Sequence, residues 1–534
     1  MTTLREGSPA LRPAGPQSHP GRWLALGVLC VSLLIVTLDN TVLNVVLPTL
    51  VRDLRATDTQ LQWIVDSYVM VFAGLLLVAG SVADRIGRKR TFLAGLTLFA
   101  AGSTWAAFSG SVGMLIAARA SMGIGGALIM PSTLSIITNM FADRTERQRA
   151  IGMWAGTSGL GIALGPIIGG LLLAHFWWGS VFLINVPIAA IGLAFAIPLV
   201  PDSKNQAARA PDIAGALLSV AGLGLLLWSI IEAPEEGWTS ALVIAAGLGG
   251  LAVLAAFAVW ERMSSHPMLR LEFFRQRSFS AAISSVGLAM LGLFGALFVL
   301  TQFLQFDLGY TPLQAGLRVL PAAGAIALIA PLSAVLIRAS GTKLTAAAGL
   351  LTIGAGLWQI SLASVTTGYT GTLPGMILLG VGAGLVIPAA TASVMGSVPP
   401  EHTGIGSATN GAVLQVGGAL GVAIIGSLLN TRYQGKITAA VSPYHVPHAV
   451  MSLISGSLGG ALMVAAHVGG GLGADLAQAA RSAFISGMDL GLATGAGVAL
   501  AGGILALAWL PGRARAADRG ASPRSAPRGE DHRP

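Results

Sequence analysis

The chain has 534 residues, of which 54% are hydrophobic and only 10% are charged. Soluble domains carry about 25% charged residues, so this composition excludes a soluble globular protein and predicts a polytopic membrane protein. The net charge of +9 does not call for a nucleic-acid partner, because the basic residues follow a topological pattern. The single cysteine, Cys30, excludes an intramolecular disulfide.

Fourteen apolar runs follow a polar N-terminal tail of residues 1–22. Each run is long enough for an α-helix to cross a hydrocarbon core, which takes about 20 residues. The expected spans are 24–47, 62–83, 91–108, 112–141, 150–175, 180–199, 213–231, 240–260, 278–306, 312–337, 344–365, 372–398, 404–430 and 484–510. We therefore predict an all-α membrane protein with 14 transmembrane helices and a second polar tail at 511–534.

The basic residues are distributed unequally between the two sides of this topology. An even number of spans places both termini on one side, and Lys and Arg mark the cytoplasmic side of a membrane protein. Most of the 31 Lys and Arg residues fall on the side of the tails. The opposite side receives only Arg52, Arg55, Arg432, Lys436 and Arg481. The pattern predicts a multi-pass protein of the cell inner (plasma) membrane with both termini cytoplasmic.

The segment between the last two spans, residues 431–481, contains a shorter apolar run at 450–466 that glycines interrupt. If this run crossed the membrane, the C-terminal tail would change sides and the charge asymmetry would be lost. We therefore expect an external helical hairpin packed on the mouth of the helix bundle. His445, His448 and His467 lie nearby, but they are too weak a ligand set to predict a metal site.

Among the charged residues inside predicted spans, two lie in motifs that bear on transport. Asp39 interrupts the first span and Arg119 the fourth. A charge inside a bilayer costs at least about 2.5 kcal/mol, so such residues usually face a partner or cavity and mark an ion or substrate path. Asp39 has the simpler alternative of a hydrogen bond to a neighbouring helix. Arg119 has the alternative of snorkelling, because it lies only about 10 Å into its helix.

The loop after the second span combines glycines, one acid and several bases. Its motif residues are Gly80, Asp84, Arg85, Gly87, Arg88 and Lys89. Glycines permit a tight turn, and Asp84 can accept hydrogen bonds from Arg88 or cap the N-terminus of a helix. A positive cytoplasmic loop would explain the basic residues alone, but not Gly80, Asp84 and Gly87 together.

The fifth span is rich in regularly spaced glycines. Gly161, Gly165 and Gly169 are four residues apart, so they lie on one face that permits close helix contact, and Gly170 follows them. Pro166 has no amide hydrogen for the carbonyl of Ile162, which favours a bend.

These motifs resemble signatures of the major facilitator superfamily. Residues 80–90 are similar to its GxLaDrxGrkr loop, residues 115–127 to its signature around an intramembrane arginine, and residues 161–170 to the gxxxGPxxGG signature of its antiporters. The resemblance implies a gating role for the loop, a proton-coupling role for Arg119, and export as the direction of transport. We expect Asp39, a carboxylate inside the membrane, to share the proton coupling.

Further stretches resemble the fourteen-helix drug:proton antiporters of that superfamily, the QacA-like multidrug exporters. They are residues 38–48, 63–68, 182–187 and 309–317. The likeness runs from about Trp23 to Leu510. It implies an N-terminal six-helix bundle (23–200), a linker with two inserted transmembrane helices (201–277), and a C-terminal six-helix bundle (278–510) that includes the hairpin. The binding cavity of such repeats lies near the membrane midplane between the bundles.

Asp66 is the residue that bears most on substrate class. It lies near the start of the second span, on one helical face with Gln62 and Met70. Some multidrug members of the group carry an acid here that contributes to recognition of cationic drugs, whereas many others carry a neutral residue. Trp63 and Tyr68 nearby could stack on a planar cation, although both residue types are also common at membrane interfaces. We expect Asp39 to join these five residues in the substrate-binding set. The alternative is that Asp66, an acid near a helix end, only reaches the aqueous interface.

The function implied is a proton-coupled antiporter that exports lipophilic, cationic drugs, dyes or antiseptics by alternating access. An exporter of an endogenous metabolite or antibiotic, not necessarily cationic, shares the same frame. An importer, a receptor and a membrane enzyme fit the motifs less well. We expect no metal, no cofactor and no nucleic acid, and as partners only protons, a small lipophilic substrate and membrane lipids around a monomer.

Overall fold

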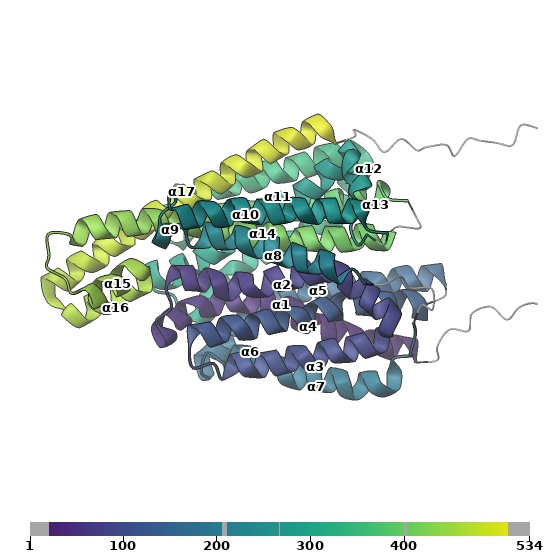
Figure 1. Cartoon of the computed structure of the whole chain (residues 1–534). Coiled ribbons are helices and arrows are strands. Elements are labelled where there is room, and N and C mark those ends of the chain that lie inside the picture. The colour runs from purple at the N-terminus through teal and green to yellow at the C-terminus, as the bar shows by residue number, and fades with distance from the viewer. Residues whose placement is uncertain (1–20, 142, 205–210, 266, 400–402, 511–534) are drawn as a thin grey trace, which may run out of the picture.

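The computed structural model describes residues 21–141, 143–204, 211–265, 267–399 and 403–510. The predicted C-terminal tail and nearly all of the N-terminal tail lie outside these residues. The described residues form helices and contain no strand, as the apolar runs predict (Figure 1).

The first group of helices packs as one bundle. It comprises α1 (Arg22–Leu54), α2 (Asp58–Ile86), α3 (Arg88–Ala107), α4 (Val112–Met140), α5 (Arg144–His175), α6 (Ser180–Leu183) and α7 (Asn185–Leu199). Local capping explains several starts. Thr57 and Gln60 form a reciprocal capping box before α2, and the Asp143 carboxylate accepts from the amides of Thr145 and Glu146 at the start of α5.

Two long helices connect this bundle to the next. After α8 (Ile213–Ile231) come the short α9 (Ala233–Glu236), α10 (Ala241–Met263) and η1 (Leu271–Arg275). α8 packs against α2 and α14, whereas α10 packs mainly against α8. The pair therefore covers one side of the seam between the two bundles.

The second group of helices comprises α11 (Arg277–Gln302), η2 (Phe303–Asp307), α12 (Pro312–Ser361), α13 (Tyr369–Gly396), α14 (Thr403–Val441), α15 (His448–Gly456), α16 (Leu458–Val468) and α17 (Gly470–Trp509). α14 and α17 extend well beyond the ends predicted for them, at residues 430 and 484. The predicted hairpin at 431–481 is thus built from the ends of two long helices with α15 and α16 between them (Figure 1).

Twelve helices within the described residues are long and apolar enough to cross a membrane, rather than the expected fourteen. One of the twelve, α12, covers two predicted spans, 312–337 and 344–365, and contains non-helical backbone at Gly341, where φ is 86°. The third predicted span, α3, begins with three basic residues and is not among the twelve.

The molecule has two distinct ends along the helix axes. One end carries α15 and α16, and we call it the hairpin end. α2 begins at this end, because Gly456 of α15 approaches Thr57, the residue that precedes α2. α2 then runs for 29 residues, or about 43 Å, to the opposite end of the molecule, where residues 80–90 lie. We call this the loop end.

Candidate functional site

A buried ion pair joins α1 and α4 inside the first bundle. The Asp39 side chain lies on α1 and the Arg119 side chain on α4, and the two residues are only 2% and 0% exposed. Nη1 of Arg119 donates to Oδ2 of Asp39, and its Nε donates to the Ile64 carbonyl at 3.2 Å. The guanidinium is therefore paired in the interior and does not snorkel to a helix end. Both an acid and a backbone carbonyl offset its charge.

Asn185 completes this network, although the sequence analysis assigned it no role. Its Nδ2 donates to Oδ1 of Asp39 at 3.2 Å and to Oγ of Ser103 at 3.1 Å, so it links α7 to α1 and α3. Asn185 is fully buried. The available signal was a polar amide in an otherwise apolar span, within a stretch noted only for its family resemblance.

Tyr68 contacts this network instead of an open cavity. The Arg119 guanidinium lies 4.4 Å from the centroid of the Tyr68 ring and 5.9 Å from that of Phe182. Tyr68 also packs against the rings of Phe72 and Phe99, at 5.6 and 6.4 Å between centroids. The aromatic face expected to stack on a planar substrate is thus engaged with the protein's own cation in this conformation.

Asp66 is a buried acid without a partner. It is 0% exposed, and neither carboxylate oxygen has a hydrogen bond within the described parts of the chain. Its neighbours on the same face of α2 reach the seam: Gln62 accepts from Oγ of Ser427 on α14 at 3.1 Å, and Met70 lies against Gly224 on α8. The predicted set of Gln62, Asp66 and Met70 therefore shares a face that is covered by α14 and α8.

Trp63 points toward the connection between α8 and α9. Its indole Nε1 donates to Oε1 of Glu232 at 2.7 Å. Burial raises the pKa of Glu232, the Trp63 hydrogen bond opposes this shift, and the nearby carboxylates of Glu235 and Glu236 add to it. The structure thus does not bring Trp63 together with Asp39.

Residues 80–90, which the sequence predicts as a loop, are helical except for Gly87, because α2 continues to Ile86 and α3 begins at Arg88. The hydrogen bond predicted within this segment is present. Nε of Arg88 donates to Oδ1 of Asp84 at 2.8 Å, which confirms the expected hydrogen bond, and Gly87 has a φ of 125° that favours glycine. Nζ of Lys89 donates to the Ile197 carbonyl at 2.6 Å, so the loop is tied to the end of α7. Arg85 is exposed.

A cavity of about 320 Å³ opens between the bundles at this loop end. Gly80 and Asp84 of α2 line it on one side, and Ile405 and Gly411 of α14 line it on the other. Pro267, in the segment before η1, closes part of its rim.

The hairpin end of the seam is closed by hydrogen bonds. In addition to the Gln62–Ser427 bond, Nδ2 of Asn430 donates to Oγ1 of Thr59 at 3.0 Å, and Nε2 of Gln305 donates to the Val45 carbonyl at 2.9 Å. The two bundles are therefore joined at the hairpin end and hold a cavity between them at the loop end.

The glycine face of α5 is used for close contact, as predicted. A Cβ atom at Gly161 or Gly165 would collide with Thr37 or Thr41 of α1, and one at Gly169 would lie 3.1 Å from Val42. Oγ1 of Thr41 donates to the Gly161 carbonyl at 3.2 Å.

The same helix also touches the second bundle. A Cβ at Gly170 would lie 2.5 Å from the Leu313 Cα of α12, and a Cβ at Gly316 would collide with the Pro166 carbonyl. α5 thus lies tightly between α1 of its own bundle and α12 of the other.

Apolar helices of this length, with a buried charge pair and a seam between two bundles, define a multi-pass membrane protein of the transporter type. The family model described as "Major Facilitator Superfamily" matches residues 29–422. The chain belongs to this superfamily.

Two similar proteins and one similar structure are informative. The chain is 35% identical to the multidrug efflux pump LfrA of Mycolicibacterium smegmatis, over 91% of this chain and 95% of LfrA. It is 32% identical to the tetracenomycin C resistance and export protein of Streptomyces glaucescens, over 91% of each chain. The inward-facing crystal structure of a bacterial homologue of the lysosomal transporter Spinster matches with a TM-score of 0.63 at 16% identity, covering 93% of this chain and 100% of that one. The last likeness concerns the fold alone.

Proposed function

We propose that the protein is a proton-coupled antiporter that exports lipophilic cations by alternating access. The observation that carries this proposal is Asp66, a buried carboxylate without a partner on the α2 face at the seam between the bundles. An unpaired charge at such a site costs several kcal/mol, so the carboxyl group requires either a proton or a cation beside it. Exchange between those two states is the chemistry of a cation:proton antiporter. The names of the similar efflux proteins support export as the direction.

In this mechanism, Asp39 and Asp66 have different roles. Asp66 binds the substrate cation in place of a proton, and Gln62 and Met70 contribute to its polar and apolar surroundings. Asp39 carries the coupling proton: when it is protonated, its ion pair with Arg119 weakens, and the Arg119 guanidinium depends more on the Ile64 carbonyl and the Tyr68 ring. Protonation at Asp39 thereby changes the contacts between α1, α2 and α4.

Alternating access then follows from the two ends of the seam. The loop-end cavity lies where a substrate would enter from the cytoplasm or inner leaflet, with Asp84 on its wall. The hydrogen bonds at the hairpin end must break before the substrate can leave. The close α5–α12 contact serves as the surface on which the bundles rotate, and the Asp84–Arg88 pair stabilises one state.

The proposed topology retains fourteen spans, with α8 and α10 as the inserted pair. The backbone break at Gly341 supports two spans within α12, and the position of α3 between α4 and α7 supports a further one. Both termini are cytoplasmic in this arrangement, the hairpin is external, and the protein acts as a monomer.

An exporter of one antibiotic or endogenous metabolite is the second candidate. The similarity to a tetracenomycin C export protein favours it. The two candidates differ at Asp66, because a substrate without a positive charge would not need that carboxylate.

The test is ethidium-driven proton movement in inverted membrane vesicles. We expect ethidium to release protons through the native protein and Asp39→Asn to abolish this response. Asp66→Asn should weaken it by about tenfold or more, because it removes the charge pair between Asp66 and the bound cation. Asp489→Asn is the matched control, because Asp489 is an exposed acid on α17. If no cationic dye moves protons through the native protein, the cation proposal fails. If an uncharged antibiotic does so and Asp66→Asn has no effect, the second candidate is correct.

A further inference from the structure

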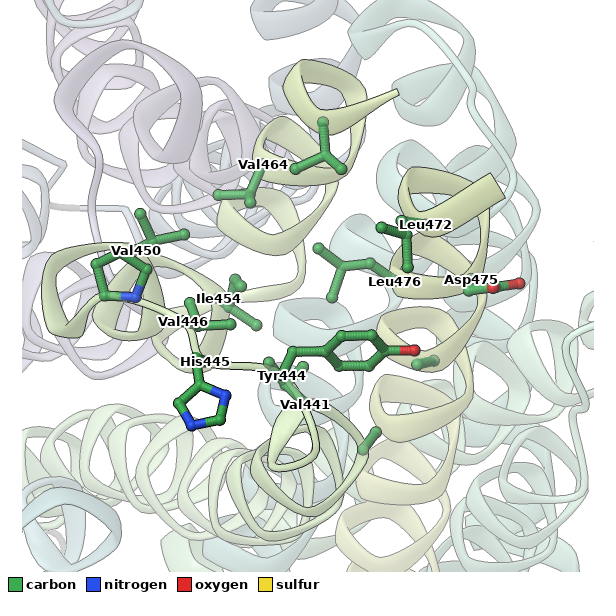
Figure 2. Close-up of a pocket in the computed structure, with 14 residues that line it drawn as sticks. Val441, Tyr444, His445, Val446, Val450, Ile454, Val464, Leu472, Asp475 and Leu476 are labelled. Carbon is green, nitrogen blue, oxygen red and sulfur yellow. The ribbon is translucent and has the colours of Figure 1, made fainter. Parts of the chain in front are cut away.

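The hairpin encloses a cavity that is separate from the seam. Its volume is about 600 Å³, and it lies between the end of α14, the following connection, α15, α16 and the start of α17. Figure 2 shows aliphatic side chains directed toward one space, among them Ile454 of α15, Val464 of α16 and Leu476 of α17. A volume of about 300–1,000 Å³ and a mainly apolar wall are typical of sites for small molecules.

The walls of this cavity are anchored to the rest of the protein. The buried Tyr433 hydroxyl of α14 donates to the carbonyls of Ile454 and Ser457 at 2.8 and 3.1 Å, which ties α15 and the start of α16 to α14. Gly459 of α16 lies close to Phe306 and Val51, so the hairpin rests on η2 and α1. The cavity is therefore a preformed part of the fold, and the hairpin that forms it rests on the closed end of the seam.

The polar groups of the lining indicate the charge of a ligand. Asp475 of α17 contributes the one carboxylate of this lining, which includes the His445 imidazole but no Lys or Arg side chain. Lys436 and Arg432 line a different cavity, between α14 and α17. In Figure 2, the Tyr444 ring lies along one edge of the cavity with its hydroxyl toward the side that carries Asp475. An exposed carboxylate and an exposed aromatic ring at the rim of aliphatic walls match a lipophilic cation.

We propose that this hairpin cavity is a second binding site for lipophilic monovalent cations. The proposal rests on the proposed function only for the source of the ligand, the exported substrate itself. The site contains none of Asp39, Asp66 and Arg119. It lies at the hairpin end, where the exported molecule leaves the seam, and it holds that molecule on apolar surface before release. A lipid acyl chain would fit the walls but would leave Asp475 without a role.

The experiment uses a cysteine reporter in the full-length protein, in lipid nanodiscs. Cys30→Ala removes the only cysteine of the chain. Val468→Cys then places a thiol of nearly the same size at a lining position of α16 that is 54% exposed and therefore open to a maleimide. The matched control is Ala474→Cys, an exposed position of α17 outside the lining. The probes are tetraphenylphosphonium and tetraphenylborate, which have the same shape and opposite charge.

We expect tetraphenylphosphonium to slow alkylation at Val468→Cys by about fivefold or more, with no effect from tetraphenylborate or at Ala474→Cys. Adding Asp475→Asn should weaken the protecting affinity by up to about fivefold, the range of an exposed charge pair. Adding Asp39→Asn should abolish transport and leave the protection unchanged, so failure of this site and failure of the proposed transport are separate results. Val446→Cys, in the α14–α15 connection, is a second reporter should the first variant fold poorly.

Three results would overturn the proposal. Equal protection by both ions would show an apolar pocket without selection for charge. Protection by neither ion, at both reporters, would show that the cavity does not bind such molecules. If the reporter cysteine reacts slowly with maleimide in the absence of any probe ion, and faster after lipid is removed, the occupant is a lipid chain.

Discussion

Breaking the Asp39–Arg119 pair should show most directly whether the first bundle depends on it. Arg119→Met removes the guanidinium from a fully buried site, so the Asp39 carboxylate keeps only its bond from Asn185 and the Ile64 carbonyl loses its donor. Loss of one partner of a buried pair costs about 3–5 kcal/mol, because the remaining charge is uncompensated. Asp39→Asn should cost a similar amount, because it leaves the buried Arg119 guanidinium without its carboxylate partner.

The double variant Asp39→Asn/Arg119→Met distinguishes pairing from simple packing. It leaves no uncompensated charge, so its free energy of unfolding should be about equal to that of either single variant, or higher. That value is well above the one expected if the losses of the two single variants added. The measurement is thermal or denaturant unfolding of purified protein, with transport assayed in parallel. All three variants should be inactive in transport. Additive losses of stability in the double variant would refute the pairing, because uncoupled residues add.

Three further perturbations test other parts of the structure. Because burial raises the pKa of Glu232 above its ordinary value of 4.5, its ionisation disfavours the folded state, and the native protein should lose stability relative to Glu232→Gln as pH rises from about 4.5 through the raised pKa. The difference between their thermal midpoints from pH 4 to 8 measures this, and a difference that is flat or rises with pH would contradict it. Gly316→Leu should force α12 away from Pro166, cost about 1–3 kcal/mol and abolish dye efflux, whereas Gly324→Leu, at an open position of the same helix, should not. Asp84→Asn should change the free energy of unfolding by less than about 1 kcal/mol, because the Asp84–Arg88 pair is partly exposed, yet lower the efflux rate; equal efflux by variant and native protein would exclude a gating role.

Some of the site follows from local spacing and could be predicted from the sequence. Asp84 and Arg88 are four residues apart across the turn at Gly87, so their hydrogen bond depends on little beyond the local backbone. Gly161 and Gly165 share one face because a helix repeats every 3.6 residues, and the close contact predicted for that face is present.

Other features depended on how the helices pack. Asp39 meets Arg119 and Asn185 across separations of 80 and 146 residues, and helical spacing cannot specify such partners. The same packing turned Tyr68 toward Arg119 and Trp63 toward Glu232, although their position near Asp66 had suggested that both rings could stack on a substrate.

The sequence by itself determined the class of the protein, because apolar length and the scarcity of charge decide whether a helix can lie in a bilayer. It also determined the motifs whose residues lie within a turn or two of each other. Only the tertiary structure decided which buried charges are paired and which, like Asp66, are not. The physical reason is that the energy of a buried charge depends on the groups within a few ångströms of it, and here those groups come from helices distant in the chain.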